Sequence, residues 1–380
     1  MKKNIALIVD IKLDSGGALG MVLSKIDLLK KSKDIKLSII TTYKSLSNYL
    51  LKKYKIDNIF FDKNYIPVRF TNYLNNLGLL KYSSFENFLI NRKVDEVFFL
   101  SPSYLNMYFN NINYIYTVFD LSHLEKKLQS LPEHDKHTIF LRNKSYFHAA
   151  KNAKKIIVGT LENKKKFCNY YNATKNKVDI IRFPPKLCTI KSNISNINNL
   201  DITKKFFLLY PAQYWKHKNH KYIIDSFIQF KKKKFLKDFF LICSGHDKGE
   251  LEKLKKIVKK NNLENKIKFL NYISDEELIY LYKNCFGLVF PSYIGSHSFP
   301  LYEGFYFNKP VFYNSSIISE ELKKFVYLID IKKKKSLLEK INVAIKFKEK
   351  NKQLIKRSKK LYKKEFNEIN LNKKLINLFK

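Results

Sequence analysis

One segment of the chain combines lysine, histidine and aromatic residues in a way that suits binding of a charged ligand. Tyr210–His220 reads YPAQYWKHKNH and contains the only tryptophan of the protein. It follows an apolar run typical of a buried strand and precedes an amphipathic helical stretch. A lysine near a helix start can neutralise phosphate charge. His217 and His220 are three positions apart, but no carboxylate or thiol accompanies them, so no metal site is predicted.

A second segment, Pro291–Phe305, combines the end of an apolar run with small polar residues and a helix start. Ser298 precedes the expected helix, and Pro300 lies in its first turn, where proline is favoured. Free backbone N–H groups at such a start can bind an anion such as a diphosphate. Glu303 lies one turn into the helix, where a carboxylate can accept hydrogen bonds from vicinal hydroxyls. The alternative is a capped surface helix with one exposed glutamate.

Two further segments lie in the first half of the chain. Asp14–Gly20 contains three glycines although glycine is scarce elsewhere, and glycines allow the backbone to approach a ligand. Its spacing is not that of a dinucleotide fingerprint, and an ordinary strand-to-helix turn is the alternative. Asp120 ends an apolar run, and an acid at the carboxyl end of a parallel strand faces the ligand crevice. A solvated or helix-capping aspartate is the alternative there.

Parallel strands with helices between them are needed to position these segments. Short, nearly continuous apolar runs alternate with stretches of helical period, which is typical of a parallel sheet covered on both faces. The predicted fold class is α/β, with two tandem Rossmann-like domains facing a central cleft. The expected strands are 5–9, 37–42, 58–61, 96–100, 114–119, 155–159, 179–183, 206–210, 239–244, 267–271, 287–291, 311–313 and 326–329.

The domain boundary is predicted from a break in this pattern. Pro184 and Pro185 cannot continue a central strand, and the stretch after them is polar and rich in asparagine and serine. We therefore expect an N-terminal domain over 1–190 and a C-terminal domain over 200–345. Residues 346–380 have helical period with neither glycine nor proline, so one C-terminal helix packing back toward the N-terminal domain is expected.

The composition limits the classes of function. The chain has 380 residues and a formal net charge of +40, which suits an anionic partner, although a bias toward lysine at neutral surface positions also accounts for it. The four cysteines lack metal-ligand spacing and suit a reducing cytoplasm. No apolar run is long enough for a membrane span, and no signal peptide is expected. A nucleic-acid-binding protein is the less favoured reading, because zinc-finger spacing and aromatic RNA-binding motifs are missing.

Taken together, these segments resemble the retaining glycosyltransferases of family 4, which have the two-domain B-type fold. The resemblance covers nearly the whole chain and is strongest over 206–315. In addition to the loop Pro211–Asn219, it rests on the stretch 269–282, on the run 290–310 and on the motif VFDLSH at 118–123. The family's phosphate-binding lysine corresponds to Lys218, and its nucleobase-side strand leads to Tyr272.

The resemblance also implies roles for the matching residues. Lys218 and the backbone near Ser296, His297, Ser298 and Phe299 would stabilise the leaving diphosphate, and Glu303 would bind the ribose. Gly16 and Gly17 would approach the donor from the other domain, while Asp120 and His123 would orient the acceptor or the sugar. The catalytic set is therefore Lys218, Asp120 and Glu303, and the donor-binding set also includes Gln213 and Tyr272.

Three positions depart from the family pattern. Gly295 stands where the first of two glutamates is usual, Gln213 where an arginine is usual, and Phe119 where a histidine is usual. Their roles are not carried over unchanged. These departures motivate the alternative of a catalytically silent scaffold with the same fold.

The expected function is transfer of a hexose-type sugar from a nucleoside-diphosphate sugar to a glycan or lipid-linked acceptor, with retention. Such relatives commonly act in assembly of bacterial surface polysaccharide or lipopolysaccharide. The resemblance implies no metal and no other cofactor, since the nucleotide sugar is a substrate. The expected location is the cytoplasm, including the inner face of the plasma membrane, where the basic surface suits anionic lipids.

Overall fold

The structure is a computed structural model of the whole chain, and it describes residues 2–12, 17–62, 73–74, 77–125, 135–190, 206–230, 239–295 and 299–379. The chain divides into two compact units. The first comprises Met1–Phe183 and Phe366–Lys380, and the second comprises Pro184–Glu365. Within the described part, no helix combines the length and the apolar character that crossing a membrane requires.

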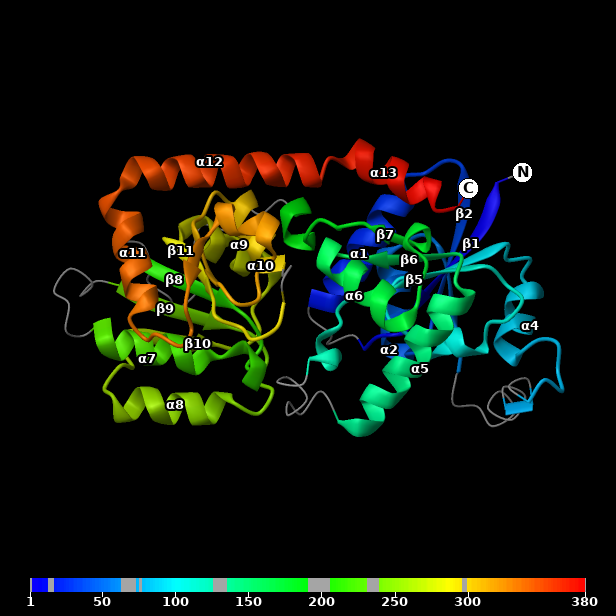
Figure 1. Cartoon of the computed structure of the whole chain (residues 1–380), viewed down its shortest axis with the longest axis horizontal. Coiled ribbons are helices and arrows are strands. Elements are labelled where there is room, and N and C mark those ends of the chain that lie inside the picture. The colour runs from blue at the N-terminus through cyan, green and yellow to red at the C-terminus, as the bar shows by residue number, and fades with distance from the viewer. Residues whose placement is uncertain are drawn as a thin grey trace. The chain divides into compact units, whose positions relative to one another are not determined.

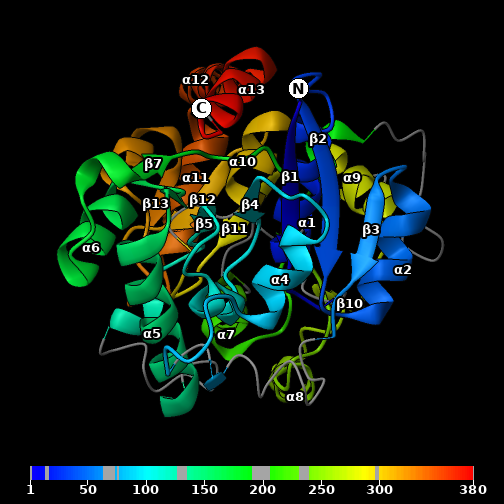
Figure 2. The same cartoon turned by 90° about the vertical axis from the view of Figure 1, so that its right-hand side faces the viewer.

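The first unit contains a parallel sheet of seven strands in the order β3-β2-β1-β4-β5-β6-β7. Figure 2 shows β1, β2 and β3 side by side, as the order requires. These strands are β1 (Lys3–Val9), β2 (Ile35–Thr41), β3 (Asp57–Phe60), β4 (Glu96–Phe99), β5 (Tyr114–Thr117), β6 (Lys155–Val158) and β7 (Val178–Ile180). The described α-helices are α1 (Gly17–Leu29), α2 (Lys44–Lys53), α4 (Ser84–Ile90), α5 (Lys136–Asn152), α6 (Leu161–Tyr171) and α13 (Glu368–Asn377), with short 3-10 turns at η1 (Tyr104–Tyr108), η2 (Ser122–Leu124) and η5 (Lys175–Lys177).

The second unit contains a parallel sheet of six strands in the order β10-β9-β8-β11-β12-β13. Figure 1 shows α7 and α8 below this sheet and α9 and α10 above it, so both faces are covered. The strands are β8 (Phe206–Pro211), β9 (Phe239–Ser244), β10 (Ile267–Leu270), β11 (Gly287–Phe290), β12 (Val311–Asn314) and β13 (Tyr327–Ile329). The α-helices are α7 (His220–Phe230), α8 (Leu251–Lys260), α9 (Asp275–Asn284), α10 (Phe299–Tyr306), α11 (Ser336–Lys346) and α12 (Lys348–Glu365), with turns η6 (Lys186–Thr189), η7 (Lys216–Lys218) and η9 (Glu320–Phe325).

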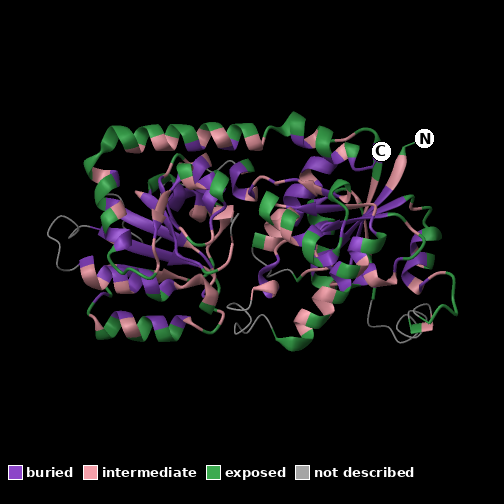
Figure 3. Ribbon diagram, viewed as in Figure 1, coloured by how far each residue is buried: buried purple, intermediate pink, exposed green. Residues whose placement is uncertain are grey.

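The predicted α/β fold with two parallel sheets is confirmed. The central strands of both sheets are buried (Figure 3), which explains why they are nearly continuous apolar runs in the sequence. α9 begins with a capping box. Ser274 Oγ accepts from the N–H of Glu277 at 3.1 Å, and the Glu277 carboxylate accepts from the N–H of Ser274 at 2.8 Å.

The C-terminal segment differs from the single helix expected over 346–380. The structure divides it into α12 and α13, because Asn367 caps a new helix by accepting a hydrogen bond from the N–H of Asn370 at 3.0 Å. α13 packs in the first unit, where Leu371 and Leu375 join the core that also contains residues of α1. α12 belongs to the second unit.

Candidate functional site

In the second unit, two of the predicted segments follow strands that are neighbours in the sheet. β8 pairs with β11, although β9 and β10 lie between them in the chain. The strand order therefore reverses between β8 and β11. In open parallel sheets, ligands bind at such a point, beyond the carboxyl ends of the strands.

Hydrogen bonds join the loop after β8 to the loop after β11. The carbonyl of His217 accepts from Ser292 Oγ at 3.1 Å and from the N–H of Tyr293 at 2.9 Å. The side-chain amide of Asn219 donates to the carbonyl of Pro291 at 3.2 Å. The structure thus brings together two segments that lie about seventy positions apart in the sequence and that were each predicted to bind phosphate.

Lys218 lies at the end of η7, directly before the start of α7. Its Nζ lies 5.5 Å from the centre of the Phe290 ring, at the end of β11. Its carbonyl accepts from the hydroxyl of Tyr210 at 2.7 Å, so the backbone of the turn is fixed. Asn219 then takes a left-handed conformation with φ of 55° before the helix begins. The half-buried lysine and the first N–H groups of α7 are therefore close to each other along the chain, as anion binding requires.

His220 is a buried residue. Its ring lies 4.6 Å from the ring of Tyr210 and 4.9 Å from that of Tyr214, measured between centroids. Burial, together with the charges of Lys218 and His217, lowers the pKa of His220 to about 3, so the ring is neutral. Among the residues that the structure describes, no cluster of three or more histidine, cysteine or acidic side chains could hold a metal ion.

Aromatic side chains follow the carboxyl ends of β8, β9 and β10. Tyr272, predicted to bind the donor, is 64% exposed, and its ring stacks on that of His246 at 4.8 Å with an interplanar angle of 10°. The side-chain carbonyl of Gln213, also predicted to bind the donor, accepts from Trp215 Nε1 at 2.9 Å. Lys248 Nζ lies 5.7 Å from the Trp215 ring. This edge therefore offers flat, partly exposed rings to a ligand.

Glu303 is buried rather than exposed, which excludes the alternative of a surface glutamate. Its side chain lies in α10, and the hydroxyl of Tyr282 in α9 donates to its Oε2. Burial raises the pKa of Glu303 from 4.5 to about 7, although the hydrogen bond from Tyr282 opposes the rise. A carboxylate with this pKa changes its charge near neutral pH.

Several predicted residues lie at the border of the described chain. Gly16, Ser296, His297 and Ser298 fall outside the described residues. Gly17 and Phe299 are described, as the first residues of α1 and α10.

Gly295 ends the described part of the loop after β11. It has φ of 109°, a conformation that L-residues rarely adopt. Its carbonyl accepts from the hydroxyl of Tyr313. The glycine that replaces the usual glutamate is therefore required by the backbone of this loop.

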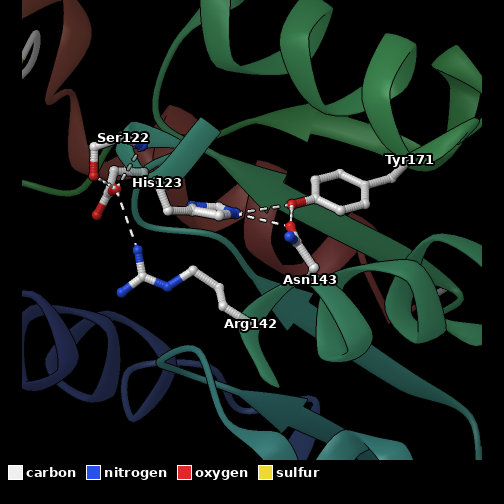
Figure 4. Close-up of polar contacts among 6 residues, drawn as sticks. Ser122, His123, Arg142, Asn143 and Tyr171 are labelled. Atoms are coloured by element: carbon white, nitrogen blue, oxygen red, sulfur yellow. Dashed lines mark hydrogen bonds and ion pairs between the residues drawn. The ribbon is translucent and has the colours of Figure 1, made fainter. Parts of the chain in front are cut away.

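In the first unit, Asp120 lies just beyond the carboxyl end of β5 with its side chain 46% exposed. Its Oδ1 accepts from the N–H of Ser122 at 2.9 Å and lies 3.7 Å from the Arg142 Nη1 (Figure 4). Burial of part of the carboxyl opposes ionisation, but the Arg142 charge and the Ser122 hydrogen bonds outweigh it and lower the pKa of Asp120. Asp120 is thus held as a carboxylate at the predicted edge.

The side chain of His123 contacts residues of α5 and α6. It is 1% exposed, and its Nε2 lies 2.9 Å from the hydroxyl of Tyr171 and 3.2 Å from Oδ1 of Asn143 (Figure 4). The Tyr171 hydroxyl in turn donates to Asn143 at 2.7 Å, so His123 donates from Nε2 to the pair. These contacts of His123 hold the turn η2 against α5 and α6. The same turn contains Ser122.

Two functional candidates were missed from the sequence. Arg142 could have been noticed because arginine is rare in this chain. Only five of the 73 lysines and arginines are arginine. Lys25 carried no such signal, because it lies on the apolar face of α1. It is fully buried and donates to the carbonyl of Leu100 at 2.6 Å and to Thr117 Oγ1 at 3.0 Å, and burial lowers its pKa. Its Nζ also lies 5.5 Å from the ring of Phe119, the residue that replaces the usual histidine.

Comparison with known families and structures agrees with this geometry. Residues 192–361, which are most of the second unit, match the model of the family described as glycosyl transferases group 1. Among curated protein sequences, no significant match was found.

Solved structures with the same fold extend over the whole chain. HepE from Anabaena in complex with UDP has a TM-score of 0.77 at 18% identity, over 100% of this chain and 99% of that one. Sucrose-phosphate synthase from Thermosynechococcus elongatus gives 0.71 at 14%, over 100% and 98%. WaaG, a glycosyltransferase involved in lipopolysaccharide biosynthesis, gives 0.65 at 14%, over 98% of each chain. At these identities the likeness shows the fold, which is the two-domain B-type fold of glycosyltransferases.

Proposed function

We propose that this chain, whose second unit carries the domain of the group 1 glycosyl transferases, transfers a hexose-type sugar from a nucleoside-diphosphate sugar to a glycan or lipid-linked acceptor, with retention. One observation carries this function. The loop of Lys218 is hydrogen-bonded to the loop after β11 where the strand order of the second sheet reverses. The two segments predicted to bind phosphate are thus neighbours, which supports a single donor site.

In this site the second unit holds the donor. Lys218 and the first N–H groups of α7 and α10 stabilise the charge that develops on the departing diphosphate, which is usually the largest single catalytic contribution. The carboxylate of Glu303 accepts hydrogen bonds from the ribose hydroxyls, exchanging its contact with Tyr282 for them. Tyr272 and Gln213 lie at the same edge and contact the nucleoside side of the donor.

The first unit supplies the acceptor side. Asp120 is ionised and partly exposed, so it can accept a hydrogen bond from a sugar or acceptor hydroxyl. His123 fixes the turn beside it, and Gly17 opens α1 at the same end of the sheet. No side chain is assigned as a general base, and the departing phosphate oxygen takes the acceptor proton. No metal is required.

The similar structures support the donor class. HepE is described in complexes with UDP and with UDP-glucose, the latter at 15% identity and a TM-score of 0.76. WaaG is described as acting in lipopolysaccharide biosynthesis. We extend these properties to a role in bacterial surface polysaccharide or lipopolysaccharide assembly, at a cytoplasmic location that suits the four buried free thiols.

The test is donor turnover by a pair of matched variants. Lys216 and Lys218 both lie in η7, and Lys216 is exposed. With the best of a panel of nucleotide sugars, Lys218→Ala is expected to lower the release of nucleoside diphosphate on the order of 100-fold, as loss of one preorganised donor does. Lys216→Ala is expected to leave it within about twofold, since surface charges contribute little.

Two outcomes would overturn this assignment. Equal losses of nucleoside diphosphate release in the two variants would show that Lys218 does not bind the diphosphate. Absence of turnover with any donor, in a protein that remains folded, would favour a silent scaffold. The anomeric configuration of the product, followed by NMR, tests retention separately.

A further inference from the structure

An apolar patch lies at the junction of α11 and α12 in the second unit. The side chains of Val343 and Phe347 are 38% and 43% exposed. The N–H of Phe347 donates to the carbonyl of Val343 at 3.0 Å, so the two residues are one turn apart. Single exposed apolar residues are ordinary on any protein, but here two of them lie one helical turn apart.

Lysines flank this patch on both helices. Lys346 Nζ lies 5.7 Å from the centre of the Phe347 ring, and Lys350 Nζ lies 5.1 Å from it. Lys348, between them in the chain, is exposed. An aromatic side chain with ammonium groups around it is suited to the boundary between lipid headgroups and acyl chains.

The rest of α12 extends the positive charge over five turns. Ser358 and Tyr362 are its buried residues, and Ser358 Oγ donates to the carbonyl of Phe325 at 2.9 Å. The other faces are largely exposed (Figure 3). The one exposed acid of α12, Glu349, forms an ion pair with Lys352 at 2.8 Å. The exposed cations are Lys348, Lys350, Lys352, Lys356, Arg357, Lys360, Lys363 and Lys364.

Another basic helix of the same unit lacks this combination. In α8, Lys253 and Lys255 form ion pairs with Glu250 and Glu252, at 2.9 and 2.8 Å. The apolar residues of α8 are turned inward, and Leu254 is among those buried. In α8, therefore, the lysines are not accompanied by exposed apolar side chains, unlike those at the junction of α11 and α12.

We infer that the α11–α12 junction binds the surface of a bilayer that contains anionic lipids, with Phe347 and Val343 entering the headgroup boundary. The exposed cations of α12 are complementary to the negative surface, and each is expected to strengthen binding about fivefold. A nucleic acid would use the lysines but would leave the two apolar side chains without a role. This surface lies outside the proposed donor site, so its loss and the loss of turnover are separable.

Co-sedimentation of the full-length protein with vesicles tests this inference. Vesicles of phosphatidylcholine with and without phosphatidylglycerol are compared. Replacing Lys346, Lys348 and Lys350 together by glutamine is expected to reduce binding to the anionic vesicles on the order of 100-fold. The charge-matched control replaces three exposed lysines of α8, Lys256, Lys259 and Lys260, by glutamine and is expected to change binding less than about threefold.

Phe347→Ser isolates the apolar contribution. It is expected to weaken binding about tenfold even at high salt, because insertion of an apolar side chain is not screened. Donor turnover with a soluble acceptor should be unchanged in every variant, which also shows that each is folded. Equal losses in the two triple variants, no effect of Phe347→Ser, or stronger binding to RNA than to anionic vesicles would overturn the inference.

Discussion

Replacing Glu303 with glutamine is expected to remove a pH dependence of stability from the second unit. The Glu303 side chain is 6% exposed, and burial raises its pKa from 4.5 to about 7. The folded protein therefore binds this proton more tightly than the unfolded chain does. Between these two values the folded state carries more protons than the unfolded state, so the free energy of unfolding falls as pH rises.

The magnitude follows from the same two values. Each tenfold change in proton affinity is worth 1.36 kcal/mol, so a rise from 4.5 to about 7 corresponds to ~3 kcal/mol. This stabilisation is fully present below about pH 4.5 and is lost as pH rises through about 7. Glutamine keeps the size of the side chain and cannot ionise, so the variant lacks this slope.

The single tryptophan makes the assay specific, because Trp215 lies in the second unit. Urea unfolding is followed by its fluorescence between about pH 5 and 8 for wild type and Glu303→Gln. The difference between their free energies of unfolding should change by ~2–3 kcal/mol over this range, with wild type losing stability relative to the variant as pH rises. If the free energies of unfolding of the two proteins depended on pH in the same way, Glu303 would not have a raised pKa in the folded state.

Three further changes test other parts of the structure. Arg142→Met should raise the pKa of Asp120 and lower kcat about fivefold, since a partly exposed ion pair is worth up to ~1 kcal/mol. Nucleotide affinity should not change. A loss of nucleotide affinity would show that Arg142 acts on the donor and not through Asp120. Gly304→Ala should destabilise the second unit by ~1–3 kcal/mol, because the added methyl group would lie 2.5 Å from a side-chain carbon of β12. Gly159→Ala, where nothing lies within 4 Å, is the control, and equal melting temperatures of the two variants would contradict the close packing. If ionised Glu303 binds ribose, nucleotide affinity should rise from about pH 6 to 8 in wild type and stay flat in Glu303→Gln, as isothermal titration can show.

The strands could be predicted because strands buried on both faces leave a plain apolar signal. β9 begins and ends at the predicted residues, 239–244. The loops after β8 and β11 were found for a similar reason, since each lies between a strand and a helix start. The two loops are hydrogen-bonded to each other because β8 and β11 are neighbours in the sheet. No local sequence pattern predicts this strand order.

Other features depend on tertiary contacts that the sequence does not express. Helical period predicted an apolar stripe near the C-terminus but not that Leu371 and Leu375 join a core with α1. The break before α13 had a local signal in Asn367, whose capping was not recognised. Lys25 is buried, although a lysine is expected at the surface. His123 lies in a loop motif, but its ring contacts the hydroxyl of Tyr171.

The most direct test of the donor site is binding of nucleotides to the folded protein. Thermal stabilisation is measured with UDP, GDP, ADP, CMP and dTDP, with and without EDTA, for wild type, Lys218→Ala and Lys216→Ala. A ligand that binds only the folded state raises the melting temperature according to its affinity. We predict a shift with one diphosphate that EDTA does not change, that Lys218→Ala loses and that Lys216→Ala keeps. No shift with any nucleotide, or a shift that survives in Lys218→Ala, would contradict a donor site at the switch point of the second sheet.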